Sequence, residues 1–228
     1  MKRTYLGAVP ILAVLLCGCQ ANALEDRCFP LLTVVDYEEN QGQVELGLFF
    51  PTPTGENGEK AQTEKEKAVT GDSFEKAWKL CEQELNKFPD YNHMKVLMIG
   101  ENFLKQQDDY EEMLEFLQGK SAYPRNTYVC VVPDVWEFVD TESLSQNPGT
   151  YLEEFLKTQG KNGGKDLPTV GKQMELMENE RGEVAIPKLT IQDKKVVWDG
   201  NYTLVPVENQ EEFLEDQTEI LKNQTQIE

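Results

Sequence analysis

The sequence has few of the residues on which metal sites and most enzyme active sites depend. Its 228 residues include one histidine, His93, and no Cys-x-x-Cys pair follows Cys19. Zinc sites use closely spaced Cys and His ligands, so this composition argues against a metal site. The phosphate-binding, nucleophile-elbow and metalloprotease motifs are also missing. A general base at His93 would need a nearby nucleophile, but Asn92 and an apolar segment flank it. We therefore expect no catalytic residue, metal or cofactor, and a His93 that is hydrogen-bonded at the edge of a strand.

Basic residues are scarce relative to acidic ones. The chain has 22 Lys and Arg against 41 Asp and Glu, a formal net charge of −19. Lys2 and Arg3 belong to the N-terminal segment, and without them 20 basic residues face 41 acidic ones. Nucleic acids and anionic lipid headgroups are bound by clustered Lys and Arg. The charge therefore excludes nucleic acid as a partner and argues against adsorption to an anionic membrane by charge alone.

Apolar runs of transmembrane length are also missing, since a spanning helix needs about 20 apolar residues. The one prominent run, residues 6–16, follows a basic start and has the length of a signal-peptide core. It ends in Leu-Cys-Gly-Cys, which resembles a bacterial lipobox. That resemblance implies cleavage after Gly18 and a diacylglyceryl thioether with palmitate-type acyl chains on Cys19. The alternative is an ordinary cleaved signal with incidental cysteines. Two acyl chains hold a protein on a bilayer far more stably than one, so we expect a lipid anchor at Cys19.

Three cysteines remain in the rest of the chain: Cys28, Cys81 and Cys130. Their number is odd and they are far apart in the sequence, so one disulfide among them stays open and no pair is favoured. Cys81 and Cys130 lie in apolar, periodic segments. Buried cysteine behaves as a small apolar residue, so we expect both in the core.

The first half of the chain predicts a sheet covered by helices. Strands are expected at 31–35 and 44–50, joined by a turn at 39–43. Residues 52–71 are charged and nearly free of apolar side chains, which predicts a flexible loop. Asp72 and Glu75 resemble a capping box, and apolar residues then recur at helical spacing until Pro89. Further elements are expected as follows: a strand at 94–99, a helix at 108–118 and a strand at 127–132.

The second half predicts shorter elements. Helices are expected at 135–138 and 150–158, followed by a Gly-rich turn at 161–165. Strands at 170–177, 183–191 and 195–198 would form a β-meander. The acidic tail, 206–228, is a terminal helix or a frayed remnant. The predicted fold class is therefore α+β: a mixed β-sheet with helices packed on it, followed by a β-meander.

Other conspicuous residues have ordinary structural explanations. Trp78 lies on the apolar face of the first predicted helix and is expected in the core. Trp136 and Trp198 are candidates for surface contacts, although the core is the better expectation. Adjacent acidic pairs, Glu111–Glu112 and Glu153–Glu154, do not face each other on a helix and are expected on solvated faces.

Several stretches, taken in order, resemble the N-terminal domain of the Ger(x)C spore germination lipoproteins, the C subunits of germinant receptors. Leu-Glu-Asp-Arg at 24–27 enters the first strand, and Ser-Phe-Glu-Lys-Ala at 73–77 opens the first helix. Residues 92–101 (NHMKVLMIGE) are similar to the family's His-x-Lys strand that ends in Gly-Glu. Residues 125–129, Leu167-Pro168 and the segment to Trp-Asp-Gly at 198–200 resemble later strands. Gln20-Ala21 departs from the family's usual Trp-Asp after the lipidated cysteine, and family members continue into a second region.

The resemblance implies three segments and a function. Residues 1–18 would be a lipoprotein signal peptide, 19–205 a Ger(x)C N-terminal-like domain, and 206–228 an acidic tail. The protein would be non-catalytic and lipid-anchored on the outer face of the cell membrane or the spore inner membrane. Its implied partners are the integral membrane A and B subunits of a germinant receptor, which acts in nutrient-triggered germination. Two other classes remain: a lipid-anchored binding protein for a small ligand, and, with least support, an envelope enzyme.

Overall fold

The computed structural model describes residues 24–38, 42–51, 68–141, 144, 147–163, 167–178 and 184–204. Several expectations lie outside these residues. They are the signal peptide, the cleavage after Gly18, the lipid on Cys19, residues 52–67 of the charged loop, and the tail.

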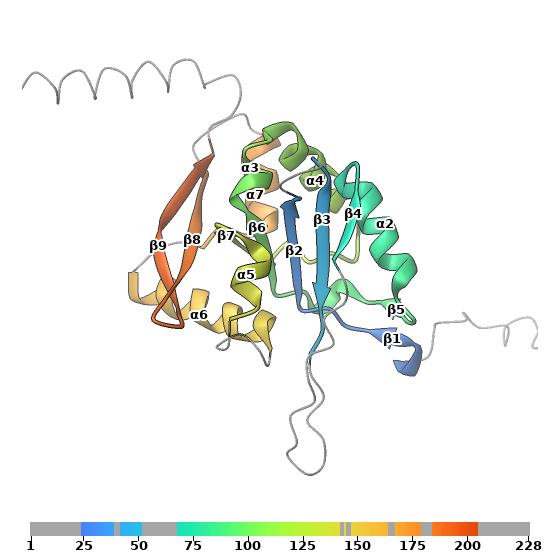
Figure 1. Ribbon diagram of the computed structural model, residues 1–228, viewed down its shortest axis with the longest axis horizontal. Helices are drawn as coiled ribbons and strands as arrows, with labels where there is room; N and C mark the ends of the chain where they lie inside the picture. The colour runs from blue at the N-terminus through green and yellow to red at the C-terminus, as the bar shows by residue number, and fades with distance from the viewer. Residues whose placement is uncertain are drawn as a thin grey trace, which may run out of the picture.

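A seven-stranded mixed sheet forms the centre of the fold (Figure 1). Its order is β4-β3-β2-β6-β7-β8-β9. Strands β2, β6, β7 and β8 pair in parallel, whereas β3, β4 and β9 are antiparallel to their neighbours. A separate parallel pair joins β1 (Arg27–Cys28) to β5 (Phe88–Pro89). The strands of the large sheet are β2 (Leu32–Tyr37), β3 (Val44–Phe49), β4 (Val69–Gly71), β6 (Val96–Gly100), β7 (Tyr128–Val132), β8 (Val184–Gln192) and β9 (Lys195–Leu204).

Helices cover both faces of this sheet. The chain forms α2 (Phe74–Glu84), α3 (Glu101–Leu104), α4 (Gln107–Gly119), α5 (Val135–Val139), α6 (Pro148–Gly163) and α7 (Val170–Glu178), with 3-10 turns η1 (Leu24–Asp26) and η2 (Tyr91–His93). One core cluster contains side chains of α2, α3, α4 and α7, and the other contains side chains of α5 and α6. In β6, Leu97 and Ile99 join the first cluster while Val96 and Met98 join the second. This alternation follows from strand geometry and confirms the predicted α+β class.

Helix α2 shows how the sequence sets its element boundaries. The side chain of Ser73 caps it by accepting a hydrogen bond from the backbone N–H of Lys76 at 3.4 Å. The expected cap, Asp72, instead forms an ion pair with Lys76 at 2.7 Å. The helix ends at Glu84 and not at Pro89, since Phe88 and Pro89 form β5.

The structure corrects three further expectations. Residues 170–178 form helix α7 and not the first strand of a meander, so the C-terminal strands are a hairpin of β8 and β9. Thr169 precedes that helix, and its hydroxyl accepts a hydrogen bond from the backbone N–H of Lys172 at 3.3 Å. Helix α6 runs to Gly163, through part of the expected Gly-rich turn. The last residues of the expected loop 52–71 form β4.

The cysteines and tryptophans behave largely as core residues. Cys81 and Cys130 are buried as expected, and Cys28 is half-buried. No disulfide links these three cysteines to one another in the described segments. Trp78 is buried, while Trp136 and Trp198 are partly buried against the second core cluster.

Candidate functional site

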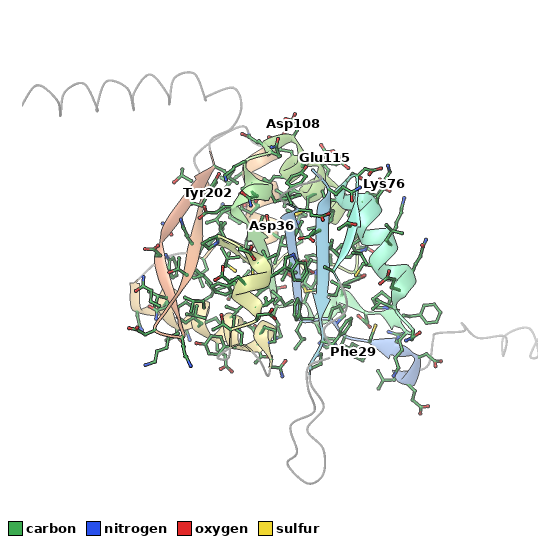
Figure 2. The ribbon with its side chains drawn as sticks, in the orientation of Figure 1. Phe29, Asp36, Lys76, Asp108, Glu115 and Tyr202 are labelled. Atoms are coloured by element: carbon green, nitrogen blue, oxygen red, sulfur yellow. The ribbon has the colours of Figure 1, made fainter. Side chains whose placement is uncertain are left out.

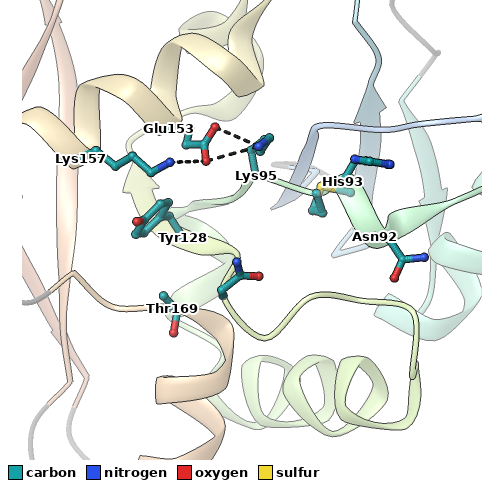
Figure 3. A pocket seen from close by; sticks show the side chains of 9 residues that line it. Asn92, His93, Lys95, Tyr128, Glu153, Lys157 and Thr169 are labelled. Atoms are coloured by element: carbon teal, nitrogen blue, oxygen red, sulfur yellow. Dashed lines mark hydrogen bonds and ion pairs between the residues drawn. The ribbon is translucent and has the colours of Figure 1, made fainter.

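A polar pocket of about 200 Å³ opens at the amino ends of β6 and β7 (Figure 3). Its lining residues are Asn92, His93, Met94, Lys95, Asn126, Tyr128, Glu153, Lys157 and Thr169. Backbone hydrogen bonds fix its floor: Lys95 N–H donates to the carbonyl of Leu31, and Tyr128 N–H donates to the carbonyl of Lys95, both at 2.9 Å. Thr169 forms an isolated antiparallel β-bridge with Tyr128. The pocket is smaller than typical sites for drug-sized ligands, so it suits a small polar group.

Glu153 holds the charged side of this pocket together. Its carboxylate lies 2.6 Å from the Lys157 ammonium, one turn along α6, and 3.3 Å from the Lys95 ammonium. The Glu153 side chain is only 15% exposed. Burial alone would raise the pKa of Glu153, but the hydrogen bonds from Lys157 and Lys95 lower it below its ordinary value. The same contact raises the pKa of Lys157. Both shifts favour the charged forms of Glu153 and Lys157 at neutral pH, so this side of the pocket is an ion-pair network of one carboxylate and two lysines.

His93 is the pocket residue that the sequence singled out. It ends η2 instead of lying at a strand edge, and its exposed ring packs edge-to-face on Phe29 with centroids 5.3 Å apart. Nothing that lines the pocket is a cysteine or a serine, and the described residues contain no group of metal-ligating side chains. The pocket side chains can supply charge and hydrogen bonds through two ammonium groups, one carboxylate, two amides, two hydroxyls and the imidazole of His93.

The carboxyl ends of the parallel strands, where ligands of such sheets often bind, are closed by Asp36 at the end of β2. Its carboxylate is 4% exposed and accepts backbone hydrogen bonds from Tyr37, Val135 and Phe103. Burial raises the pKa of Asp36 to about 6, against the opposing effect of those N–H groups. A Cβ on Gly100 would lie 1.9 Å from Asp36 Cγ, so the carboxyl group fills the space beside the end of β6. Asp36 is thus a packing group.

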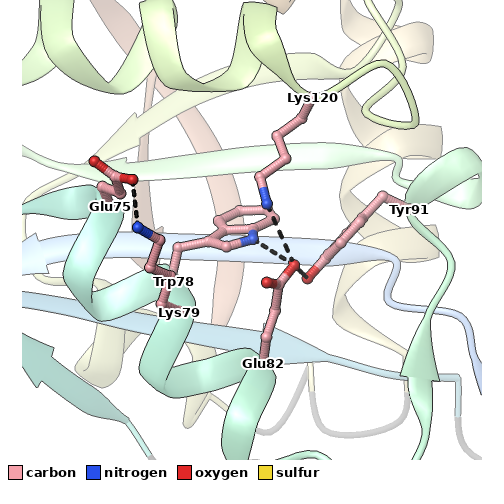
Figure 4. Close-up of polar contacts among 6 residues, drawn as sticks. All are labelled: Glu75, Trp78, Lys79, Glu82, Tyr91 and Lys120. Atoms are coloured by element: carbon pink, nitrogen blue, oxygen red, sulfur yellow. Dashed lines mark hydrogen bonds and ion pairs between the residues drawn. The ribbon is translucent and has the colours of Figure 1, made fainter.

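A second polar cluster joins α2 to the loop before β6 (Figure 4). One oxygen of Glu82 accepts hydrogen bonds from Trp78 Nε1 at 2.7 Å and from the Tyr91 hydroxyl at 3.0 Å. Lys120 lies 3.7 Å from the same oxygen and 4.9 Å from the centroid of the Phe116 ring. This arrangement satisfies two buried donors and pins α2 to its neighbours, which makes it a structural cluster.

Sequence reasoning missed two parts of this geometry. Glu153 is expected from the sequence on a solvated face, Lys95 enters only as part of the His-x-Lys resemblance and not as a pocket residue, and Asp36 is not singled out. The spacing of Glu153 and Lys157 at i and i+4 was a usable signal for their ion pair. Lys95 is 58 residues from Glu153, and its approach depends on how α6 packs on the sheet. The charges of a pocket assembled in this way cannot be paired from the sequence.

Comparison with known proteins gives one match. A family model described as the spore germination protein N-terminal domain matches residues 20–191. No curated protein and no solved structure matches the chain. The matched span contains all the residues that line the pocket, which lie between Asn92 and Thr169.

Proposed function

Because this chain belongs to the spore germination proteins that share this N-terminal domain, we propose that it is a C-subunit-like, membrane-anchored component of a germinant receptor. The family match over most of the chain is the observation that carries this proposal. It gives the protein a part in spore germination. The receptor assignment adds partners, namely the integral membrane A and B subunits, and a location at the spore inner membrane or the cell membrane.

The anchor in this proposal is Cys19. Its support is the apolar run of 6–16 followed by Leu-Cys-Gly-Cys, which places a thiol where lipoproteins are acylated. Among the helices that the structure describes, none is long and apolar enough to cross a membrane. A diacylglyceryl group on Cys19 would hold the domain at the outer face of the bilayer.

The proposal treats the protein as non-catalytic. The two pocket lysines are ion-paired with Glu153, and the raised pKa of Lys157 makes its charged ammonium group a poor general base. Partner recognition fits the surface better. Helix α4 carries five acidic residues and no basic one, which suits a basic patch on a partner: Asp108, Asp109, Glu111, Glu112 and Glu115. Complementary charge of this kind improves encounter rate and specificity more than affinity.

The test is deletion of the gene followed by a germination assay with defined nutrients. We expect slower or incomplete germination, restored by the wild-type gene but not by Cys19→Ala at equal protein level. Affinity purification of the wild-type protein from spore membranes should also recover the A and B subunits. Normal germination of the deletion strain, together with no recovery of either subunit, would contradict the receptor role.

The pocket favours a second candidate, a lipid-anchored protein that binds a small ligand. Ammonium, carboxylate and amide groups in about 200 Å³ match a small zwitterion or carboxylate. Ligand that binds only the folded state raises the unfolding temperature by mass action. A thermal-shift screen of free amino acids should then give a rise that Lys157→Met removes and Lys172→Met, outside the pocket, retains. If no amino acid raises the unfolding temperature, the small-ligand function is contradicted and the receptor proposal is unaffected.

A further inference from the structure

Two large apolar side chains are more exposed than any others among the described residues. Leu24 in η1 is 71% exposed and Phe88 in β5 is 58% exposed. They belong to one corner of the molecule, because β1 directly follows η1 and pairs Arg27 with Phe88 (Figure 1). Single exposed apolar residues are common on protein surfaces, so the pair alone does not define a binding surface.

The η1 part of this corner lies close in sequence to Cys19, the residue that carries the lipid in the proposed function. A role for this corner at the membrane rests on that lipid. Leu24 is the fifth residue after Cys19. A fully extended chain spans at most about 3.6 Å per residue, so five residues reach at most about 18 Å. A lipid on Cys19 therefore keeps η1 within that distance of the acyl attachment point. The most exposed apolar residues of the domain are those that the tether holds closest to the bilayer.

The charged side chains also distinguish this corner from the opposite end of the molecule. The segments around β1 and β5 and the adjoining pocket carry charges of both signs: Arg27, Lys87, Lys95 and Lys157 against Glu25, Asp26, Glu84, Asp90 and Glu153. Helix α4 holds the uniformly acidic surface. Figure 2 shows its Asp108 and Glu115 at one end of the molecule and Phe29, next to β1, at the other. An anionic bilayer repels acidic side chains within about a Debye length, so the end with basic residues among the acidic ones approaches it more readily than α4 does.

We propose that η1 with the β1–β5 pair is the membrane-facing surface of the domain. Leu24 and Phe88 lie at the boundary between lipid headgroups and acyl chains, and α4 points away from the bilayer. Side chains at such a boundary are buried about 5–10 Å deep. The lipid then sets the orientation of the domain as well as its location, and the acidic helix α4 is presented to whatever stands above the membrane.

The experiment measures how deeply a probe at residue 88 sits in lipid. Cys28→Ser removes the half-buried thiol, while Cys81 and Cys130 are buried and shielded from labelling. Phe88→Cys then carries a bimane label in the full lipidated chain, reconstituted into phosphatidylcholine–phosphatidylglycerol vesicles. Glu115→Cys on α4 is the matched control, since its side chain is also exposed. Spin-labelled lipid in the vesicles should quench the bimane fluorescence at position 88 by about twofold, because that probe lies at the boundary between headgroups and acyl chains. The probe at position 115 lies outside the lipid, so its fluorescence should be nearly unchanged.

Flotation with the vesicles and the intact mass of the chain separate the outcomes. A chain that carries the diacylglyceryl mass and floats, but whose probe at 88 is quenched no more than that at 115, overturns this orientation and leaves the anchor in place. A chain without the added mass, which does not float, overturns the anchor and the orientation together. An unlipidated Cys19→Ala chain labelled at 88 should show no quenching, because Leu24 and the probe at position 88 alone bind lipid too weakly.

Discussion

At the residue scale, Asp36 is a buried carboxyl group whose pKa makes the stability of the fold depend on pH. It is a carboxyl group buried beside backbone N–H donors at the end of β2, with a pKa raised to about 6 from 3.8. The folded protein therefore binds this proton more tightly than the unfolded chain does. Its contribution to stability is full below pH 4 and is lost as the pH rises through 6.

Replacing Asp36 by Asn should remove this pH dependence. The free energy of unfolding of the wild type, relative to Asp36→Asn, should fall between pH 4 and pH 6.5. A difference of about two pKa units corresponds to a change of about 3 kcal/mol at most. Urea unfolding at several pH values measures it. Asp72→Asn is the control with the opposite sign, because the hydrogen bond from Lys76 lowers the pKa of the exposed Asp72. A relative stability that is constant or rises with pH would contradict this account of Asp36.

Gly100 is expected to tolerate no side chain. A Cβ there would lie 1.9 Å from Asp36 Cγ, so Gly100→Ala should destabilise the fold by about 3 kcal/mol, at the upper end for overpacking. Gly119, the last residue of α4, has open space around the same position. Gly119→Ala should therefore be neutral or stabilise by up to about 1 kcal/mol. Thermal unfolding of the two variants checks this, and equal effects would show that the contact with Asp36 is relaxed at no cost.

At the scale of elements, α2 is held by its apolar face and by the acceptor that Glu82 provides. Glu82→Ala leaves Trp78 Nε1 and the Tyr91 hydroxyl without that acceptor, and we expect a loss of about 1–3 kcal/mol. Glu84→Ala, on the exposed side of the same helix, should change stability by less than about 0.5 kcal/mol. Denaturant unfolding followed by tryptophan fluorescence separates the two. A loss at Glu84 as large as that at Glu82 would contradict the role of Glu82 as the acceptor, because alanine itself favours the helix.

The predictable elements are those whose periodicity is repeated over several residues. Helix α2 and strand β6 were predicted because four-residue spacing and continuous burial are unambiguous in them. Helix α7 was not, because a segment with Val170, Met174 and Leu176 shows both two-residue and four-residue spacing. The Thr169 cap was the signal that could have decided between them. The order of strands in the sheet depends on packing between distant segments and could not be read from local pattern.

At the scale of the whole molecule, the family match gives the domain a part in spore germination, and the charge distribution agrees with the proposal that it acts by contact at a membrane. The sequence supports the anchor and the family; the structure adds where the pocket lies and which end is acidic. The pocket could not be predicted, since Lys95 and Glu153 meet only after α6 packs on the sheet. The carboxyl edge, which the fold class would favour for a ligand, is instead filled by Asp36.

Cys19→Ala tests the anchor in the cell. The wild-type protein should fractionate with membranes as a processed species, because acylation precedes cleavage after Gly18. The variant should appear in the medium or remain unprocessed. Ser73→Ala is a suitable control, since loss of the α2 cap should cost about 1 kcal/mol without changing the fraction. A processed Cys19→Ala protein that stays with the membrane would show that another part of the chain holds it there.

The central claim is that a lipid on residue 19 holds this germination domain at a membrane. Mass spectrometry of the N-terminal peptide of the mature protein, extracted from membranes, tests it most directly. We expect the peptide to begin at Cys19 and to carry the added mass of a diacylglyceryl group. A mature peptide that begins elsewhere, or a Cys19 without lipid, would contradict the account.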